Sequence, residues 1–314
     1  MGKYLFKKIC GLFVVLFGVS VLTFGLTSMI QGNPAEIVLR QAGHDATLEE
    51  IALMEARLGL DRTLAGQYLH WLSNVVRLDF GTSYITRRPV IDEIALRLPP
   101  TLWLSVSSFG LMILLSVPVS ILAVSCHGRW PDKVIGVITF TFMGVPGFVL
   151  GMVLMYFISV YFELLPMVGD ITAARFVLPV ITLALPMACR YVRIIKAALL
   201  EILREDYIFL LRVQGLRERT VLMGNALKNA LIPIVNLMGL SLGALVGGSI
   251  VVESIFSWPG LGSFLLASIG NRDYPIVIAY VLLMATVFVV INFLVDILTC
   301  FLDPRISFRN TGPL

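Results

Sequence analysis

Charged residues are scarce in this sequence. Asp, Glu, Lys and Arg make up 14% of its 314 residues, whereas hydrophobic residues make up 58% and the mean hydropathy is +0.90. A soluble domain of this length would need more charge to cover its surface, because typical usage is about 25%. The net charge of +4 is also too small to indicate a surface for nucleic acid. The composition therefore predicts a polytopic membrane protein.

Residues that catalyse reactions or bind metals and nucleotides are few as well. The three histidines, His44, His70 and His127, belong to no H-E-x-x-H motif and no Cys/His ligand set, so metalloprotease chemistry has no support. No G-x-x-x-x-G-K-[ST] motif is present, so any ATP would have to be bound by another subunit. The four cysteines show no metal-like spacing and are expected to be unpaired thiols. We expect no catalytic residue, cofactor or metal in this chain.

The sequence contains long runs without charged residues. They are Ile9–Ala35, Leu98–Cys126, Val134–Phe162, Phe176–Cys189, Asn229–Val252 and Tyr274–Val295. Five exceed the roughly 20 residues that an α-helix needs to cross a bilayer. The fourth is short, but it continues through residues 191–198, where Arg193 and Lys196 are expected to snorkel toward lipid headgroups. The sequence predicts an all-α protein with six transmembrane helices.

The basic residues predict the orientation of these helices. Lys3, Lys7 and Lys8 precede the first run as in a secretory signal, but the apolar part is too long and no A-x-A-like cleavage site follows it. We therefore expect a retained first helix. The two short outside loops hold only Arg175 and Arg272, whereas the inside loops are basic, so both termini are expected in the cytoplasm.

The chain is expected to have three parts. These are residues 1–97, with the first helix and an extracytoplasmic segment, residues 98–303, with five helices and a cytoplasmic loop at 197–228, and a cytoplasmic tail at 304–314. Within the outside segment, Thr47 and Glu50 have the spacing of a capping box, which predicts a small helical cap. The cap either meets a soluble partner or packs on the helix ends.

Glycines recur in the fifth run. Gly239 to Gly243 matches the G-x-S-x-G pattern of hydrolases, but that pattern requires a strand, a strained turn and a helix, whereas here it lies in an apolar helix. We therefore reject a hydrolase. Gly239, Gly243 and Gly247 are spaced every fourth residue, so they share one face and predict a seam where another helix approaches closely.

Ionisable residues inside the runs could mark a proton-driven transporter, which is the alternative function class. Asp296 lies near the cytoplasmic end of the sixth run, and Glu253 closes the fifth run on the outer side. Both positions are typical of interfacial helix ends rather than of a relay at the membrane midplane. This weakens the hypothesis of a proton-coupled secondary transporter without removing it.

The densest charge lies between Glu205 and Pro233. Asp206 precedes an apolar helix, Gly215 supplies the permissive backbone that ends a helix, and a basic helix is expected to start near Leu216. Such a helix, glycine turn and helix would present a short apolar ridge flanked by charge, which suits a groove on a soluble partner. The alternative is a basic helix lying on anionic lipid.

This segment, DYIFLLRVQGLRERTVLMGNALKNALIP, resembles the EAA loop of ABC-importer permeases, in the form found in the dipeptide, oligopeptide and nickel permease family. Other landmarks agree along the chain: LDFGTSY before RPV, LPPTL, GVPGFVLG, ESIFSWPGLG, NRDYP and LDPRI. The sequence departs from the pattern at Leu210 and Leu211, where the loop favours small residues.

The resemblance implies a bacterial inner-membrane permease subunit that is not itself an enzyme. Its expected partners are a second, homologous permease in a heterodimer, two P-loop ATPases that bind ATP and Mg, and an extracytoplasmic substrate-binding protein. The residues implied to dock the ATPase are Asp206, Tyr207, Leu211, Arg212, Gly215 and Leu216. NRDYP, VFVVINFLVD and LDPRI resemble nickel or metal-chelate permeases more than dipeptide ones, so the expected cargo is a metal chelate or a peptide.

Overall fold

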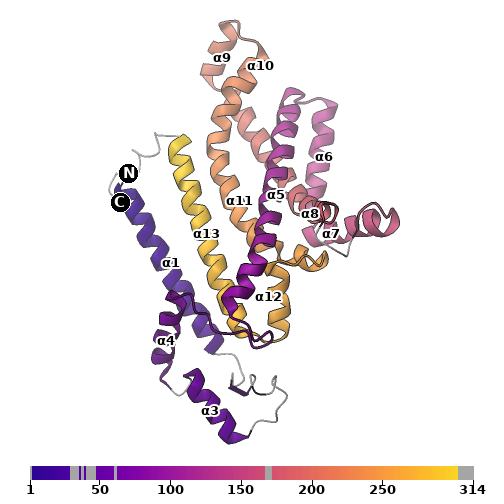
Figure 1. Cartoon of the computed structure of the whole chain (residues 1–314). Coiled ribbons are helices and arrows are strands. Elements are labelled where there is room, and N and C mark those ends of the chain that lie inside the picture. The colour runs from indigo at the N-terminus through magenta and orange to yellow at the C-terminus, as the bar shows by residue number, and fades with distance from the viewer. Residues whose placement is uncertain are drawn as a thin grey trace. The chain divides into compact units, whose positions relative to one another are not determined.

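The computed structural model describes residues 2–28, 35–36, 39, 47–59, 62–166 and 172–302, and its helices are labelled in Figure 1. His44 and the basic residues of the tail lie outside these residues. The chain forms two compact units, which are described separately below. One comprises Met1–Pro99 with Ser263–Val289, and the other comprises Pro100–Gly262 with Val290–Leu314.

The part of the first unit that the structure describes has helices before the second long apolar helix. They are α1 (Gly2–Ser28), α3 (Leu48–Leu58) and α4 (Leu64–Val76). The predicted capping box is confirmed, because the Glu50 amide donates to the Thr47 hydroxyl at 3.4 Å and the Thr47 amide donates to the Glu50 carboxylate at 2.9 Å. Helix α4 packs on α1 through Tyr68, whose ring centroid lies 5.4 Å from that of Phe24. The segment between the first two apolar runs is thus helical over α3 and α4.

A buried carboxylate organises the loop that follows α4. Asp273 accepts hydrogen bonds from the Ser83 hydroxyl at 2.5 Å and from the Tyr84 amide at 3.0 Å. Burial, with smaller contributions from Asp273 and Tyr274, raises the pKa of Tyr84 to about 12, so this phenol stays protonated. Two stretches that are distant in sequence, LDFGTSY and NRDYP, are therefore joined within this unit.

The long helices follow the apolar runs. The elements from α5 onward are α5 (Val90–Ser125), α6 (Trp130–Gly144), α7 (Gly147–Leu154), η1 (Met155–Tyr161), α8 (Ala173–Ile202), α9 (Asp206–Val213), α10 (Glu218–Thr220), η2 (Val221–Ala226), α11 (Leu227–Ile255), α12 (Leu261–Gly270) and α13 (Tyr274–Leu302). Among the described residues, four helices are long and apolar enough to cross a membrane, or five if one bent pair counts as a single span.

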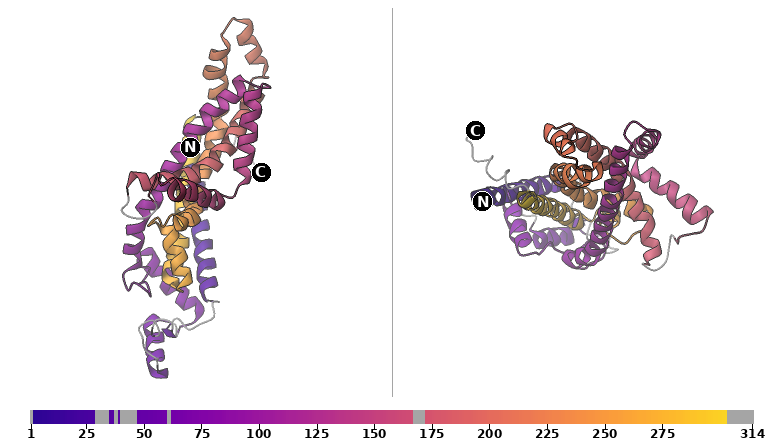
Figure 2. Two further views of the ribbon diagram at one scale, coloured as in Figure 1. Left: turned by 90° about the vertical axis from the view of Figure 1, so that its right-hand side faces the viewer. Right: turned by 90° about the horizontal axis from the view of Figure 1, so that it is seen from above.

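The third predicted span is not one straight helix. Helix α6 ends at Gly144, and the segment formed by α7 and η1 leaves it at an angle of 101°. The change of direction is visible in Figures 1 and 2. Pro146 explains the break, because proline lacks an amide hydrogen and forces the preceding residue out of the helical region. Val145 is accordingly extended, with φ −82° and ψ 124°. The prediction of a continuous helix over Val134–Phe162 was wrong at this point.

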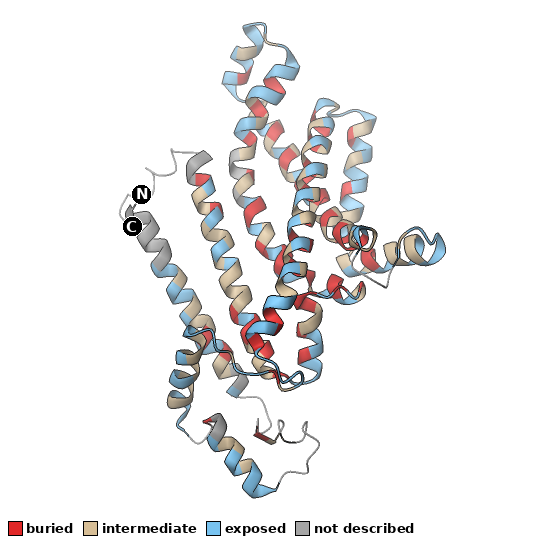
Figure 3. Cartoon of the chain, in the orientation of Figure 1, coloured by how far each residue is buried: buried red, intermediate tan, exposed pale blue. Residues whose placement is uncertain are grey.

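The fourth apolar run forms the 30-residue helix α8, which contains Pro179 and Pro186 and is long and apolar enough to cross a membrane. It packs against α6, α7 and α11 in the second unit, and many of its residues are buried (Figure 3). Lys196 forms an ion pair with Asp132 of α6, and its predicted extension toward lipid headgroups stays a prediction. The negative charge of the Asp132 carboxylate attracts the Lys196 ammonium and keeps it beside α6.

Glu253 lies near the end of α11, and its side chain is fully buried within the protein. The carboxylate accepts hydrogen bonds from the Thr101 hydroxyl at 2.8 Å, the Ser249 hydroxyl at 2.9 Å and the Gly262 amide at 2.7 Å. The Thr101 hydroxyl oxygen in turn accepts from the Leu261 amide at 2.8 Å. The landmarks LPPTL and ESIFSWPGLG thus meet around one carboxylate, which satisfies the rule that buried charges are paired or hydrogen-bonded.

The three glycines of the predicted seam have different surroundings. A Cβ atom at Gly239 would collide with Val295 of α13, so close approach of a helix does occur there. Gly243 is buried, whereas Gly247 is exposed and a Cβ atom there would meet nothing within 4 Å. A continuous seam through all three positions stays a prediction, and α11 does contain Gly239 to Gly243 as an ordinary helical stretch.

Candidate functional site

The charged segment forms a helix, a glycine turn and a second helix, as predicted. Helix α9 begins at Asp206 and ends at Val213, and the backbone then turns through Gly215, whose φ is +84°. That left-handed conformation favours glycine because other residues meet a steric penalty there. The chain continues through α10 and η2 into α11, so the turn is held at the end of a long helix (Figure 1).

Hydrogen bonds and one ion pair close the turn. The Gly215 amide donates to the Arg212 carbonyl at 3.0 Å, and the Leu216 amide donates to the Leu211 carbonyl at 3.2 Å. The Arg212 guanidinium donates to both carboxylate oxygens of Glu218, at 2.7 Å and 3.3 Å. Two parallel bonds of this kind fix direction as well as distance. Both side chains are exposed, so the ion pair orients the turn but adds little to the free energy of unfolding.

One face of α9 attaches the loop to the protein. Ile208 is fully buried in a core formed mainly by α8, η2 and α11, and Leu211 and Leu216 pack against the same core. The Asn229 side-chain amide donates to the Tyr207 hydroxyl at 2.9 Å, which ties the start of α9 to α11. Burying Ile208 stabilises the attachment by about 2 kcal/mol.

The opposite face of α9 is apolar and exposed, and Figure 3 shows this helix largely in pale blue. The exposed fractions are 65% for Phe209, 58% for Leu210 and 67% for Val213. The sequence-based prediction missed these residues and chose Leu211, which is half-buried. We call these three exposed residues the α9 patch; the charged residues Asp206 and Arg212 belong to the same helix.

An open cavity lies where α8 leads into α9. Its volume is about 620 Å³, and it is lined by Ala197, Leu200, Glu201, Arg204, Glu205 and Asp206. The first predicted docking residue, Asp206, is therefore placed at the rim of a hollow beside the α9 patch. Three carboxylates and one guanidinium give this hollow an acidic character.

The six predicted docking residues thus lie together in one loop but occupy different places. Arg212 and Gly215 shape the turn, Leu211 and Leu216 contact the core, and Asp206 and Tyr207 begin α9. The structure does not show what binds them, and docking stays a prediction at this stage. Within the part of the chain that the structure describes, no group of three or more His, Cys, Asp and Glu residues could hold a metal ion.

The sequence of this chain matches two families of transporter components. Residues 99–308 match the family described as binding-protein-dependent transport system inner membrane component, and residues 1–105 match the N-terminal family of such membrane components. The first match alone covers more than half of the chain, including the glycine turn and the α9 patch.

Individual proteins are similar over the whole length. The glutathione transport system permease protein GsiC of Escherichia coli (strain K12) is 40% identical over 309 residues, which cover 98% of this chain and 100% of that protein. The protein of the same name from Shigella boydii serotype 4 has the same identity and coverage. Inward-facing structures of the MetNI methionine ABC transporter match with a TM-score of 0.55 at 22% identity, over 67% of this chain and 96% of that chain, which shows a shared fold.

Proposed function

Because the chain belongs to the family of binding-protein-dependent transport system inner membrane components, we propose that it forms half of the translocation pathway of an ATP-driven importer of short peptides. The chain is an ABC-importer permease subunit and not itself an enzyme. Membership implies ATPase subunits, a substrate-binding protein and a second permease as partners. The observation that carries the peptide assignment is the 40% identity to a glutathione permease across nearly the whole chain.

The proposed topology has six spans with both termini in the cytoplasm. The spans are α1, α5, the bent pair of α6 with α7 and η1, α8, α11 and α13. The apolar length of α5, α8, α11 and α13 supports four of them. The basic residues on the loops expected inside support the orientation. In this arrangement the glycine turn faces the cytoplasm, where ATP is available.

The α9 patch is proposed as the surface that docks an ATPase. An amphipathic helix that inserts its apolar face into a groove is a common mode of recognition. Phe209, Leu210 and Val213 supply that face, while Ile208 on the other side anchors the helix to the core. Closure of two ATPases would pull on α9 and shift the permease between outward and inward access. ATP and Mg would be bound by the ATPases and not by this chain.

A second permease, in a heterodimer with this chain, is proposed to complete the pathway. The exposed glycine face at Gly247 leaves room for a closely packed helix, because a Cβ atom there would meet nothing within 4 Å. An extracytoplasmic binding protein would deliver cargo on the opposite side from the ATPases. Helices α3 and α4 are candidates for contacting it.

Short peptides are favoured over metal chelates as cargo. Glutathione is a tripeptide, and the similar permeases named above carry that word in their names. The relatives named above give no specific support to nickel as the cargo. The comparisons likewise give no support to a proton-coupled carrier.

Uptake into proteoliposomes tests the proposal. The complete transporter, with its ATPases and binding protein, is supplied with radiolabelled glutathione, with dialanine and with a nickel chelate in separate assays. We expect ATP-dependent accumulation of at least one of the two peptides that a proton uncoupler does not reduce. Accumulation of the nickel chelate alone would overturn the peptide assignment, and uptake that follows a proton gradient without ATP would overturn the importer itself.

A further inference from the structure

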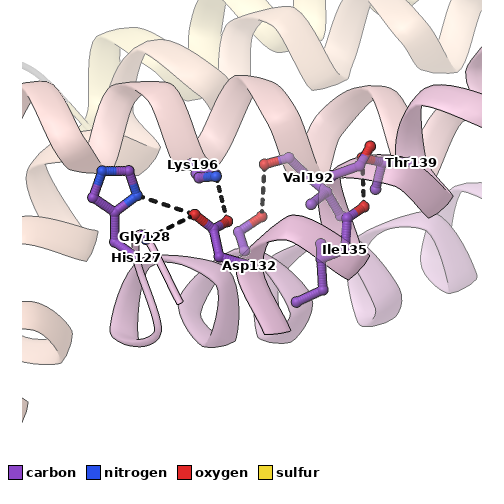
Figure 4. A network of polar contacts seen from close by, with 9 residues as sticks. His127, Gly128, Asp132, Ile135, Thr139, Val192 and Lys196 are labelled. Atoms are coloured by element: carbon purple, nitrogen blue, oxygen red, sulfur yellow. Dashed lines mark hydrogen bonds and ion pairs between the residues drawn. The ribbon is translucent and has the colours of Figure 1, made fainter. Parts of the chain in front are cut away.

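A charged network joins the α5–α6 turn to α8. Asp132, in the first turn of α6, is 7% exposed and pairs with the Lys196 ammonium of α8. Its second carboxylate oxygen accepts from the Gly128 amide at 3.2 Å and lies 3.2 Å from His127 Nδ1. Figure 4 shows these groups converging on the one carboxylate from two elements.

Two further contacts join the same helices nearby. The Ser120 hydroxyl of α5 donates to the Val192 carbonyl of α8 at 3.2 Å. The Arg193 guanidinium of α8 lies 5.9 Å from the centre of the Phe140 ring of α6. Helix α8 is therefore attached to α5 and α6 by polar and cation–π contacts over about one turn.

Lys196 occupies the part of α8 that is also attached to α9. Its neighbours Ile195 and Leu199 are fully buried in the core that holds Ile208 of α9. Helix α8 ends at Ile202, only a few residues before α9 begins at Asp206. A displacement of α9 therefore acts on the same turns of α8 that carry the ion pair, because packed cores transmit strain.

Most lysines at a helix surface keep their ammonium in water. Here the ammonium meets a carboxylate that is almost entirely buried, and a buried pair is costly to form unless its geometry and further hydrogen bonds are good. Replacing such a pair by neutral residues of similar volume often leaves stability unchanged or higher. The ion pair and the Gly128 hydrogen bond form a direct connection between α8 and the start of α6.

We propose that Asp132 and Lys196 are positioning residues that transmit movement of α9, through α8, to α6 and the bent α6–α7 segment. This inference rests on the proposed function, because it requires an ATPase that moves α9. The pair would make α6 follow α8 when the pathway changes between its two states. Loss of the pair would leave the transporter able to hydrolyse ATP while moving less cargo for each ATP consumed.

The test compares the assembled transporter carrying unmodified chain, Lys196→Arg, and the doubly neutral variant Asp132→Asn with Lys196→Met. The readouts are assembly with the ATPases, the ATP hydrolysis rate and the uptake of radiolabelled glutathione or dialanine for each ATP hydrolysed. The doubly neutral variant leaves no unpaired buried charge, so it is expected to fold and assemble. We expect its uptake per ATP to fall roughly fivefold or more, whereas Lys196→Arg keeps most of it.

Two outcomes would overturn the inference, and a third would overturn the proposed function. Normal uptake per ATP in the doubly neutral variant would show that the pair has no role in coupling. Failure of that variant to assemble would also overturn the inference, because the pair would then serve folding. If the unmodified transporter shows no ATP-driven peptide uptake, the proposed function fails instead, and the two failures are thereby distinguished.

Discussion

The carboxylate of Glu253 accepts a hydrogen bond from the hydroxyl of Thr101 at 2.8 Å, although 152 residues separate them in the sequence. This bond joins the end of α11 to the early part of α5 within one compact unit. Both residues are almost completely buried, and Ser249 and Gly262 also donate to the carboxylate. Glu253 therefore connects the end of α11 both to Thr101 of α5 and to Gly262 at the start of α12.

Replacing Glu253 with alanine should destabilise the chain strongly. The change leaves the donors of Thr101, Ser249 and Gly262 without the carboxylate, and each unsatisfied buried group costs about 1–3 kcal/mol. We expect a clearly lower midpoint of thermal unfolding in detergent. Glu201→Ala is the matched control, because Glu201 is exposed and its loss should change the midpoint little. Equal midpoints for the two variants would refute the role given to Glu253.

Gly260→Ala should also destabilise the hydrogen-bonded region around Glu253. A Cβ atom at Gly260 would lie against the Glu253 carboxylate and 2.6 Å from the Thr101 hydroxyl oxygen. Overpacking of this kind costs roughly 1–3 kcal/mol. At Gly248 a Cβ atom meets nothing within 4 Å, so Gly248→Ala should be tolerated by the isolated chain. Thermal unfolding of both purified variants checks the difference, and a Gly260→Ala chain as stable as the unmodified one would contradict it.

Substitutions of Gly215 should differ in effect according to how well each residue tolerates the left-handed backbone conformation. Gly215 has φ +84° and open space where a Cβ atom would lie, so strain and not collision decides the outcome. A β-branched residue is disfavoured there by about 1–3 kcal/mol, whereas asparagine tolerates the left-handed region. We expect Gly215→Val to reduce recovery of the ATPases in co-purification and Gly215→Asn to retain more. Equal recovery with both variants would show that the turn conformation does not govern docking.

Leu210 and Leu211 of α9 should respond differently to replacement by aspartate. Leu210 is 58% exposed, whereas Leu211 packs against the core. Leu210→Asp should therefore weaken ATPase co-purification with little effect on thermal unfolding. Leu211→Asp should lower the unfolding midpoint too, because it brings a charge to the edge of an apolar core. If Leu210→Asp retains the ATPases at the unmodified level, the α9 patch is not the docking surface.

The long helices could be predicted from the sequence because their signal is local. A run of apolar residues such as Tyr274–Val295 satisfies its backbone hydrogen bonds within itself, whatever surrounds it. The helix, glycine turn and helix were predictable for the same reason, since Gly215 ends α9 by its own conformational freedom. The capping box at Thr47 and Glu50 likewise involves residues only three positions apart.

The features that could not be predicted depend on distant partners or on short segments. Nothing near Glu253 in the sequence indicates that its side chain is buried and hydrogen-bonded to Thr101. The exposed face of α9 was misjudged because eight residues hold too few turns for a periodicity to separate Leu210 from Leu211. The break near Pro146 had a local signal, but the uninterrupted apolar composition favoured one continuous span.

The central claim is that this chain works as the permease subunit of an ATP-driven importer. The most direct test is affinity purification of the chain from its native membrane in mild detergent, followed by mass-spectrometric identification of the proteins that accompany it. The account predicts recovery of a second permease of the same family together with P-loop ATPases. Recovery of this chain alone, repeated after a gentler extraction, would contradict the account.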